Sequence, residues 1–323
     1  MIDYRKKTIT KGQQQLRCGY TTGTCAAAAA KAAAVALLTG EICRDVAICL
    51  PGGENILLET ETLEHQKNCV KCGVIKDAGD DPDITNGLMI CAAVEKNTSG
   101  EICIDGGEGV GRVTQPGLDQ PVGAAAINSV PRKMIQEAVE SVCRQYHYTE
   151  GLMVTISIPK GRETAEKTLN PMLGIVGGLS VLGTTGIVEP MSEKALIDTI
   201  AVDIRRHRAQ GEDILVMAPG NYGLDYLKAA CDIHSEQVIK ISNFVGDSID
   251  LAVCEGASGI VLAGHIGKLI KVAGGIMNTH SHQADARMEI LTAYAAVAGA
   301  DGETLRLMMK AVTTDAGMEI LQR

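Results

Sequence analysis

Residues 17–34 read RCGYTTGTCAAAAAKAAA, a cluster of Gly, Thr and Cys followed by an almost pure alanine run. Alanine has the highest intrinsic helix propensity, so the run predicts a helix over Thr24–Leu38 that stops at Gly40. So slim a helix would let a sheet or a flat ligand approach closely. We expect Thr22 or Thr24 to cap its start, where free N–H groups attract carboxylates. Dense packing against a sheet is an alternative interpretation, compatible with the first.

Length, charge and hydropathy set the broad class of protein. The chain has 323 residues, 46% of them hydrophobic, and a net charge of −9. This length favours two domains, and the acidic balance argues against general nucleic-acid binding. No run reaches the roughly 18 apolar residues that a membrane span needs, and the N-terminal MIDYRKKTITKGQQQ lacks a signal-peptide core. We therefore expect a cytoplasmic protein with no membrane partner; homo-oligomer formation is left open.

The cysteines do not predict a metal site. Eleven are scattered along the chain, mostly in apolar stretches, and this favours reduced, buried side chains. Cys69 and Cys72 form one CxxC without a second pair or a nearby His, which is a weak zinc signal.

The first half of the chain predicts an α+β domain with a mixed sheet over residues 1–166. A second helix is expected over Ser129–Arg144, since apolar residues recur there on one face. Short runs rich in β-branched residues and bounded by Gly, Pro or Asn predict the strands. These strands are Val46–Leu50, Ile56–Glu59, Cys69–Ile75, Leu88–Val94, Glu101–Ile104 and Met153–Ile158.

Residues 167–323 predict an α/β domain with an open, mostly parallel sheet. Four nearly continuous apolar runs, GLSVLG, DILVMA, QVIKI and GIVLAG, alternate with helical patterns, as expected when helices cover both faces of a sheet. The last fifty or so residues look helical. The predicted fold is thus two domains, α+β then α/β.

Small or polar residues follow each of those four runs. Ligands of open parallel sheets bind beyond the carboxyl ends of the strands, so the four loops predict one shared crevice. Ordinary turn chemistry is the alternative explanation. The stretch GIVGGLSVLGTTG, which contains the first of these loops, lacks a GxGxxG fingerprint. The evidence for a dinucleotide site is therefore weak. The loops are Gly183–Gly186, Pro219–Gly223, Ser242–Asp247 and His265–Lys268.

Three further patterns contain polar side chains of catalytic or binding types. Asp77, Asp80, Asp81 and Asp83 crowd into KDAGDDPDITNG, where a turn built on Asx side chains is favoured slightly over a cation or acid–base site. The THSH segment at residues 279–282 could ligate a metal, but a helix cap is the simpler account. Single arginines could hold ligand carboxylates in forked geometry; the candidates are Arg17, Arg112 and Arg132.

Taken together, seven stretches resemble the cobalt-precorrin-5B (C1)-methyltransferase family of the anaerobic cobalamin pathway. They are RCGYTTGTCAAAAAKAA, VIKDAGDDPDIT, GVGRVTQPGL, NPMLGIVGGLSVLGTTGIVEPMSEKA, PGNYG, SNFVGD and GHIGKLIKVAGGIMNTHS, from Arg17 to about Glu289. The resemblance implies methyl transfer from S-adenosylmethionine to C1 of cobalt-precorrin-5B, giving cobalt-precorrin-6A. It also implies two α/β-type domains and a tetrapyrrole that brings its own cobalt, with no protein metal site.

This resemblance suggests a role for each of the candidate residues. The crevice of the second domain would hold S-adenosylmethionine and the first domain the macrocycle, with His265 or Asp77 as the catalytic base. Cofactor-binding candidates are Gly183, Thr184, Thr185, Gly186, Gly220, Asn221, Tyr222, Asn243 and Asp247; substrate-binding candidates are Arg17, Thr22, Thr24, Arg112, Arg132 and Lys268. Two rival functions are a non-catalytic tetrapyrrole carrier and a nicotinamide-dependent oxidoreductase.

Overall fold

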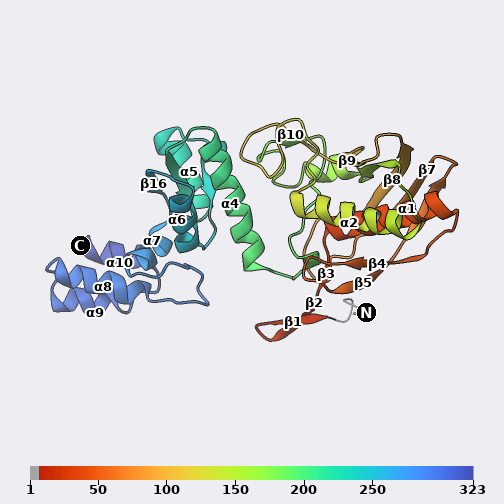
Figure 1. Ribbon diagram of the computed structural model, residues 1–323. Coiled ribbons are helices and arrows are strands. Elements are labelled where there is room, and N and C mark those ends of the chain that lie inside the picture. Colours follow the sequence, from red (N-terminus) through yellow and green to blue (C-terminus); the bar gives the residue numbers. More distant parts are fainter. Residues whose placement is uncertain (1–6, 323) are drawn as a thin grey trace. The chain divides into compact units, whose positions relative to one another are not determined.

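The computed structural model describes residues 7–322, arranged in two compact units that divide after Ser192 (Figure 1). Residues 1–6, the start of the polar N-terminal stretch, lie outside the described part. The division falls later than the boundary predicted after residue 166. The reason is strand pairing: β12 (Ile175–Val176) pairs with β10 (Arg112–Val113), and β13 (Ile187–Val188) pairs with β3 (Gly19–Tyr20).

The first unit is built on a five-stranded mixed sheet in the order β6-β7-β8-β11-β9. Only the β11–β9 pair is parallel, so the mixed sheet predicted for this domain is confirmed. Two hairpins, β1–β2 and β4–β5, stand apart from it. The other elements are β1 (Thr8–Lys11), β2 (Gln14–Arg17), α1 (Thr22–Thr39), β4 (Asp45–Cys49), β5 (Asn55–Glu59), β6 (Glu61–His65), β7 (Cys69–Ile75), β8 (Met89–Asn97), β9 (Ile102–Gly106), α2 (Ser129–Gln145), β11 (Gly151–Ser157) and α3 (Gly161–Ala165).

Helix α1 is the centre of this unit. It packs against α2 and against strands β7 and β8, so that it is covered on several sides (Figure 1). The alanines from Ala26 to Ala30 are 0% exposed, and Gly40 ends the helix in the left-handed conformation as predicted. Alanine suits these positions because larger side chains would push α2 and the sheet away from α1. By length and composition α1 could cross a membrane, but most of it is buried inside the unit, as in core helices generally.

The second unit contains a three-stranded parallel sheet in the order β15-β14-β16. Three of the four apolar runs form it. The fourth, GLSVLG, was wrongly assigned to this sheet, since Leu179 and Val181 bridge to Val110 and Ile127 in the first unit. The elements are α4 (Glu193–Ala209), β14 (Ile214–Ala218), α5 (Asn221–Cys231), η2 (Ser235–Gln237), β15 (Ile239–Lys240), α6 (Val245–Cys254), β16 (Gly259–Leu262), α7 (Ile266–Ala273), α8 (Arg287–Val297), α9 (Gly302–Met308) and α10 (Thr314–Leu321).

Candidate ligand-binding site

The second unit has a cavity of about 390 Å³ beyond the carboxyl ends of its three strands. The loops after β14, β15 and β16 all contribute to it. These are three of the four loops that the sequence placed at one shared crevice. This is the usual position of ligands in open parallel sheets. The cavity is lined by Pro219, Gly220, Tyr222, Gly223, Asn243, His265, Gly267, Lys268, Lys271, Thr279, His280, Ser281 and Arg287.

Two lysines of α7 give the cavity a cationic wall. Lys268 Nζ donates to the carbonyl oxygen of Pro219 and, at 3.5 Å, to that of Ser242. Lys271 is only 4% exposed, and its Nζ donates to the carbonyl oxygens of Thr279 at 3.2 Å and Ala284 at 2.8 Å. Burial, together with the neighbouring charge of Lys271, lowers the pKa of Lys268. Both ammonium groups thus donate hydrogen bonds to neutral carbonyl oxygens.

His265 lies at the start of α7 as its N-cap. Its Nδ1 accepts the N–H of Gly267 at 3.1 Å, and its Nε2 lies 3.5 Å from Asp315 Oδ1. The ring of Tyr222 lies 5.2 Å away, centroid to centroid. The cap contact uses the Nδ1 lone pair, so a neutral His265 carries its proton on Nε2. Proton removal from a substrate by this side chain therefore competes with helix capping.

Residues 274–286 form a loop beside the cavity, where the sequence analysis favoured a helix cap for the THSH segment. The loop is joined to the strand ends by a bridge between Asn278 and Phe244 and by Thr279, which donates to Asn243 Oδ1 at 3.3 Å. Neither Thr279 nor Ser281 caps a helix, since α8 begins only at Arg287. The THSH motif was the one signal that could have placed this loop at the site.

The predicted cofactor residues fall into three groups. Gly220, Tyr222 and Asn243 line the cavity. Asn221 and Asp247 lie in the first turns of α5 and α6, outside its lining. The loop Gly183–Gly186, including Thr184 and Thr185, belongs to the first unit instead.

That loop contacts the start of α1, where the Thr21 N–H and Thr24 Oγ1 both donate to the carbonyl oxygen of Gly186. Gly183 has a φ of 136°, and a Cβ there would lie 2.4 Å from Thr21 Oγ1, so only glycine fits. Thr22 Oγ1 accepts the N–H of Leu182, and Thr24 Oγ1 donates to the carbonyl of Gly186. Both threonines are buried, and they attach the loop to the helix.

Most N–H groups at the start of α1 donate to oxygens of the protein itself. Thr21, rather than Thr22 or Thr24, is the N-cap, and its Oγ1 accepts the N–H of Thr24. The N–H of Gly23 donates to the carbonyl of Leu182, and that of Cys25 to the carbonyl of Thr21. The N–H groups of Gly23, Thr24 and Cys25 are therefore bound to the protein's own oxygens rather than free, as the sequence analysis had expected them to be.

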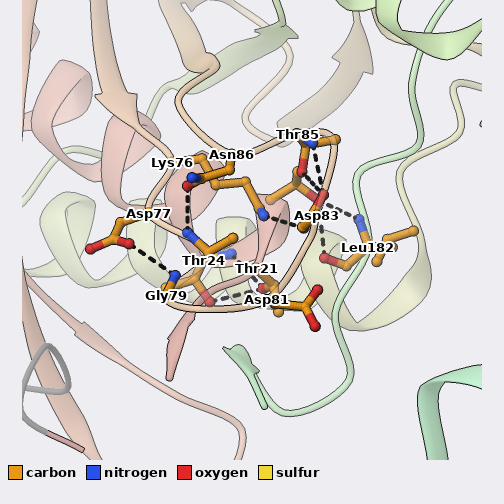
Figure 2. Close-up of polar contacts among 12 residues, drawn as sticks. Thr21, Thr24, Lys76, Asp77, Gly79, Asp81, Asp83, Thr85, Asn86 and Leu182 are labelled. Atoms are coloured by element: carbon orange, nitrogen blue, oxygen red, sulfur yellow. Dashed lines mark hydrogen bonds and ion pairs between the residues drawn. The ribbon is translucent and has the colours of Figure 1, made fainter. Parts of the chain in front are cut away.

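Two of the four aspartates after β7, Asp77 and Asp83, form the Asx turns that the sequence favoured (Figure 2). Asp77 and Asp83 accept N–H groups two residues ahead, at Gly79 and Thr85. Asp80 accepts the N–H of Arg17, and Asp81 that of Met191. No group of three or more His, Cys, Asp or Glu able to hold a metal occurs within residues 7–322.

The predicted substrate arginines of the first unit have partners within it. Arg17 forms a forked ion pair with Asp77 at 2.7 and 2.9 Å, and Arg112 forms one with Asp105 at the same distances. Hydrogen bonds from Arg112 lower the pKa of Asp105. Arg132 donates to three backbone carbonyls, those of Ile127, Ile104 and Ala125. Each of the three guanidinium groups therefore already has hydrogen-bond acceptors within the first unit.

A second cavity, of about 770 Å³, lies in the first unit between the β4–β5 hairpin and strands β6 and β7. Its apolar lining includes Ile42, Leu57 and Ile75, each more than two-fifths exposed. Carboxylates such as Asp45 and Glu61 also line it. It is large enough for a bigger ligand than the cavity of the second unit.

These features define a two-unit α/β protein with a ligand cavity at the carboxyl edge of a parallel sheet. The sequence matches the CbiD family over residues 9–190 and the CbiD C-terminal domain over residues 278–323, and the chain belongs to this family. It is 50% identical over 307 residues to the cobalt-precorrin-5B C(1)-methyltransferase of Ruminiclostridium cellulolyticum, covering 95% of this chain and 80% of that protein.

Two other matches are a further relative and a solved structure. The cobalt-precorrin-5B C(1)-methyltransferase of Salmonella typhimurium strain LT2 is 44% identical over 95% of this chain and 80% of its own. The crystal structure of the cobalamin biosynthesis protein cbiD from Archaeoglobus fulgidus is 28% identical, covers 88% of this chain and 89% of that chain, and superposes with a TM-score of 0.48.

Proposed function

We propose that this protein is a cytoplasmic methyltransferase that methylates C1 of cobalt-precorrin-5B, with S-adenosylmethionine as the methyl donor, to give cobalt-precorrin-6A. The observation that carries the proposal is the match to curated relatives of this name at 44–50% identity over 95% of the chain or more. S-adenosylmethionine supplies a methyl group already activated on a sulfonium. The protein's part is then to position the two partners and exclude water.

The cavity of the second unit is the proposed donor site. Its volume of about 390 Å³ lies within the range of small-ligand pockets and is too small for a whole tetrapyrrole. A Cβ on Gly220 would meet only Lys268 Nζ, at 3.6 Å, so the backbone here is open to a ligand. The ring of Tyr222, 73% exposed, offers a flat surface beside it. These properties fit an adenosyl compound with one anionic end.

The first unit is the proposed macrocycle-binding surface. Its 770 Å³ cavity and the exposed side chains of Ile42, Leu57 and Ile75 suit a large flat ring. Because Asp45 and Glu61 line the same cavity, we expect the acetate and propionate arms of the ring to point away from them. The cobalt enters as part of the substrate.

His265 is a better candidate than Asp77 for the base that removes a ring proton. His265 lines the donor cavity, whereas Asp77 is held by Arg17 and by the Gly79 N–H. Replacing His265 with Asn keeps a good helix cap and removes the imidazole, so it separates the two roles. If His265 is the base, His265→Asn lowers kcat by about 100-fold or more without changing the unfolding midpoint. Full turnover in His265→Asn would assign His265 to capping alone.

Turnover is tested directly with the purified full-length protein. We expect S-adenosylhomocysteine to form together with a tetrapyrrole heavier by one CH₂ unit when cobalt-precorrin-5B and S-adenosylmethionine are supplied. Macrocycle binding without S-adenosylhomocysteine formation would instead indicate a carrier. Calorimetric titration with NADPH tests the oxidoreductase alternative, for which we expect no binding.

A further inference from the structure

The lysine pair of α7 is an unusual feature of the second-unit cavity. Lys268 and Lys271 both line it, and Lys271 is almost completely buried. The acceptors of their ammonium groups are four backbone carbonyl oxygens, from Pro219, Ser242, Thr279 and Ala284. Within residues 7–322, no carboxylate lies within 4.0 Å of either ammonium nitrogen.

Such an arrangement is electrostatically incomplete. Buried charges in proteins are normally balanced by an opposite charge, since carbonyl dipoles replace only part of the lost hydration. A nearby acidic group is Asp285: hydrogen bonds from Arg287, at 2.6 and 2.8 Å, and also the charge of Lys271 lower its pKa, but its hydrogen bonds do not come from either lysine. An anion entering the cavity would therefore gain two charge-assisted hydrogen bonds that the folded chain has left unmade.

We propose that Lys268 and Lys271 form a carboxylate-binding subsite, in which the two ammonium groups hold a carboxylate of the bound ligand. This inference rests on the proposed function and refines it. Two ligands of the proposed reaction carry carboxylates: the methionine end of the donor, and the acetate or propionate arms of the macrocycle. Each ammonium has a third N–H in addition to its carbonyl contacts, so one carboxylate can bridge both without breaking them.

The test compares ligands with and without the carboxylate on the full-length protein by calorimetry. The probes are S-adenosylhomocysteine, 5′-methylthioadenosine, which lacks the amino-acid end, and uroporphyrin as a polycarboxylate tetrapyrrole. The variants are Lys268→Met and the charge-preserving Lys268→Arg, with Lys228→Met on exposed α5 as the matched control. Lys271→Met is added where its unfolding midpoint equals that of the wild type, since Lys271 also joins the loop to α7.

If the subsite binds the donor's carboxylate, Lys268→Met lowers the affinity for S-adenosylhomocysteine about tenfold to hundredfold. The affinity for 5′-methylthioadenosine then stays unchanged. If the subsite binds a carboxylate of the macrocycle, only the affinity for uroporphyrin falls by that factor. Lys268→Arg recovers most of the lost affinity in either case, and Lys228→Met changes none. Unchanged affinity of Lys268→Met for all three probes would overturn the subsite, even for a protein that still methylates cobalt-precorrin-5B.

Discussion

Removing the charge of Asp83 should destabilise the first unit far more than removing that of its neighbour Asp81. Asp83 Oδ2 lies 2.5 Å from Lys76 Nζ, and the Lys76 side chain is 1% exposed while that of Asp83 is 24% exposed. Asp83→Asn keeps the contact with the Thr85 N–H but leaves the lysine charge buried without an anion (Figure 2). Asp81, by contrast, accepts a backbone N–H from Met191 at 2.9 Å and forms no ion pair within residues 7–322.

The size of the effect follows from where the two charges lie. Breaking a buried pair from one side costs about 3–5 kcal/mol, because the partner charge stays desolvated. For Asp81→Asn we expect about 1 kcal/mol or less, the value of one hydrogen bond. The double variant Lys76→Met/Asp83→Asn removes the stranded charge as well. It should therefore be more stable than Asp83→Asn alone, by about 1–3 kcal/mol.

Urea unfolding followed by circular dichroism gives the four free energies, from wild type, both single variants and the double variant. A shift in the midpoint at constant slope measures the change in stability. If Asp83→Asn and Asp81→Asn lose the same stability, or if the double variant is the least stable, then the pair does not carry the stabilisation argued here.

The same pair makes a prediction about pH. Burial alone would raise the pKa of Asp83, but the charge of Lys76 and hydrogen bonds from Lys76 and Thr85 outweigh it and lower the pKa. A lowered folded-state pKa contributes stability that is present above the ordinary value of about 4 and is lost as pH falls through the folded value. The wild type should therefore lose stability faster in acid than Lys76→Met does.

Three other outcomes are expected. Gly220→Val fills the second-unit cavity without a backbone clash, so it should weaken S-adenosylhomocysteine by tenfold or more in calorimetry while the unfolding midpoint stays within error. Ala30→Leu overpacks the buried face of α1 and should lower the free energy of unfolding by about 1–3 kcal/mol; Lys31→Ala, half-buried on the same helix, should lower it less. Burial raises the pKa of Cys25 to about 12, so in the native state at pH 8 mass spectrometry should find it unalkylated when exposed Cys254 has reacted.

Local sequence patterns predicted most elements of both units, because helix and strand periodicity depend on nearby residues. They failed for GLSVLG, an apolar run that reads like a strand of a parallel sheet. Which sheet such a run joins depends on distant partners, here Val110 and Ile127, and no local pattern encodes them. The same limit explains why the two compact units divide after Ser192 and not after residue 166.

The candidate site was predictable where topology alone determines position. Gly220, Asn243 and His265 follow three parallel strands, so their meeting in one cavity follows from strand order. Lys271 could not be found in this way. It lies within a helix, and its direction toward the cavity depends on the loop of residues 274–286, whose path is set by the contacts of Asn278 and Thr279 with the strand ends.

The partners of the cations explain why recognition of a ligand carboxylate is expected in the second unit. Arg17 and Arg112 already share two hydrogen bonds each with a carboxylate, so a ligand anion would have to displace a partner of equal charge. Lys268 and Lys271 have only carbonyl partners, and an incoming carboxylate would add a charge interaction without removing one. An arginine already paired with a carboxylate is thus a weaker guide to anion binding than a lysine whose hydrogen bonds go only to carbonyl oxygens, because only the lysine gains a new charge-assisted hydrogen bond from the ligand.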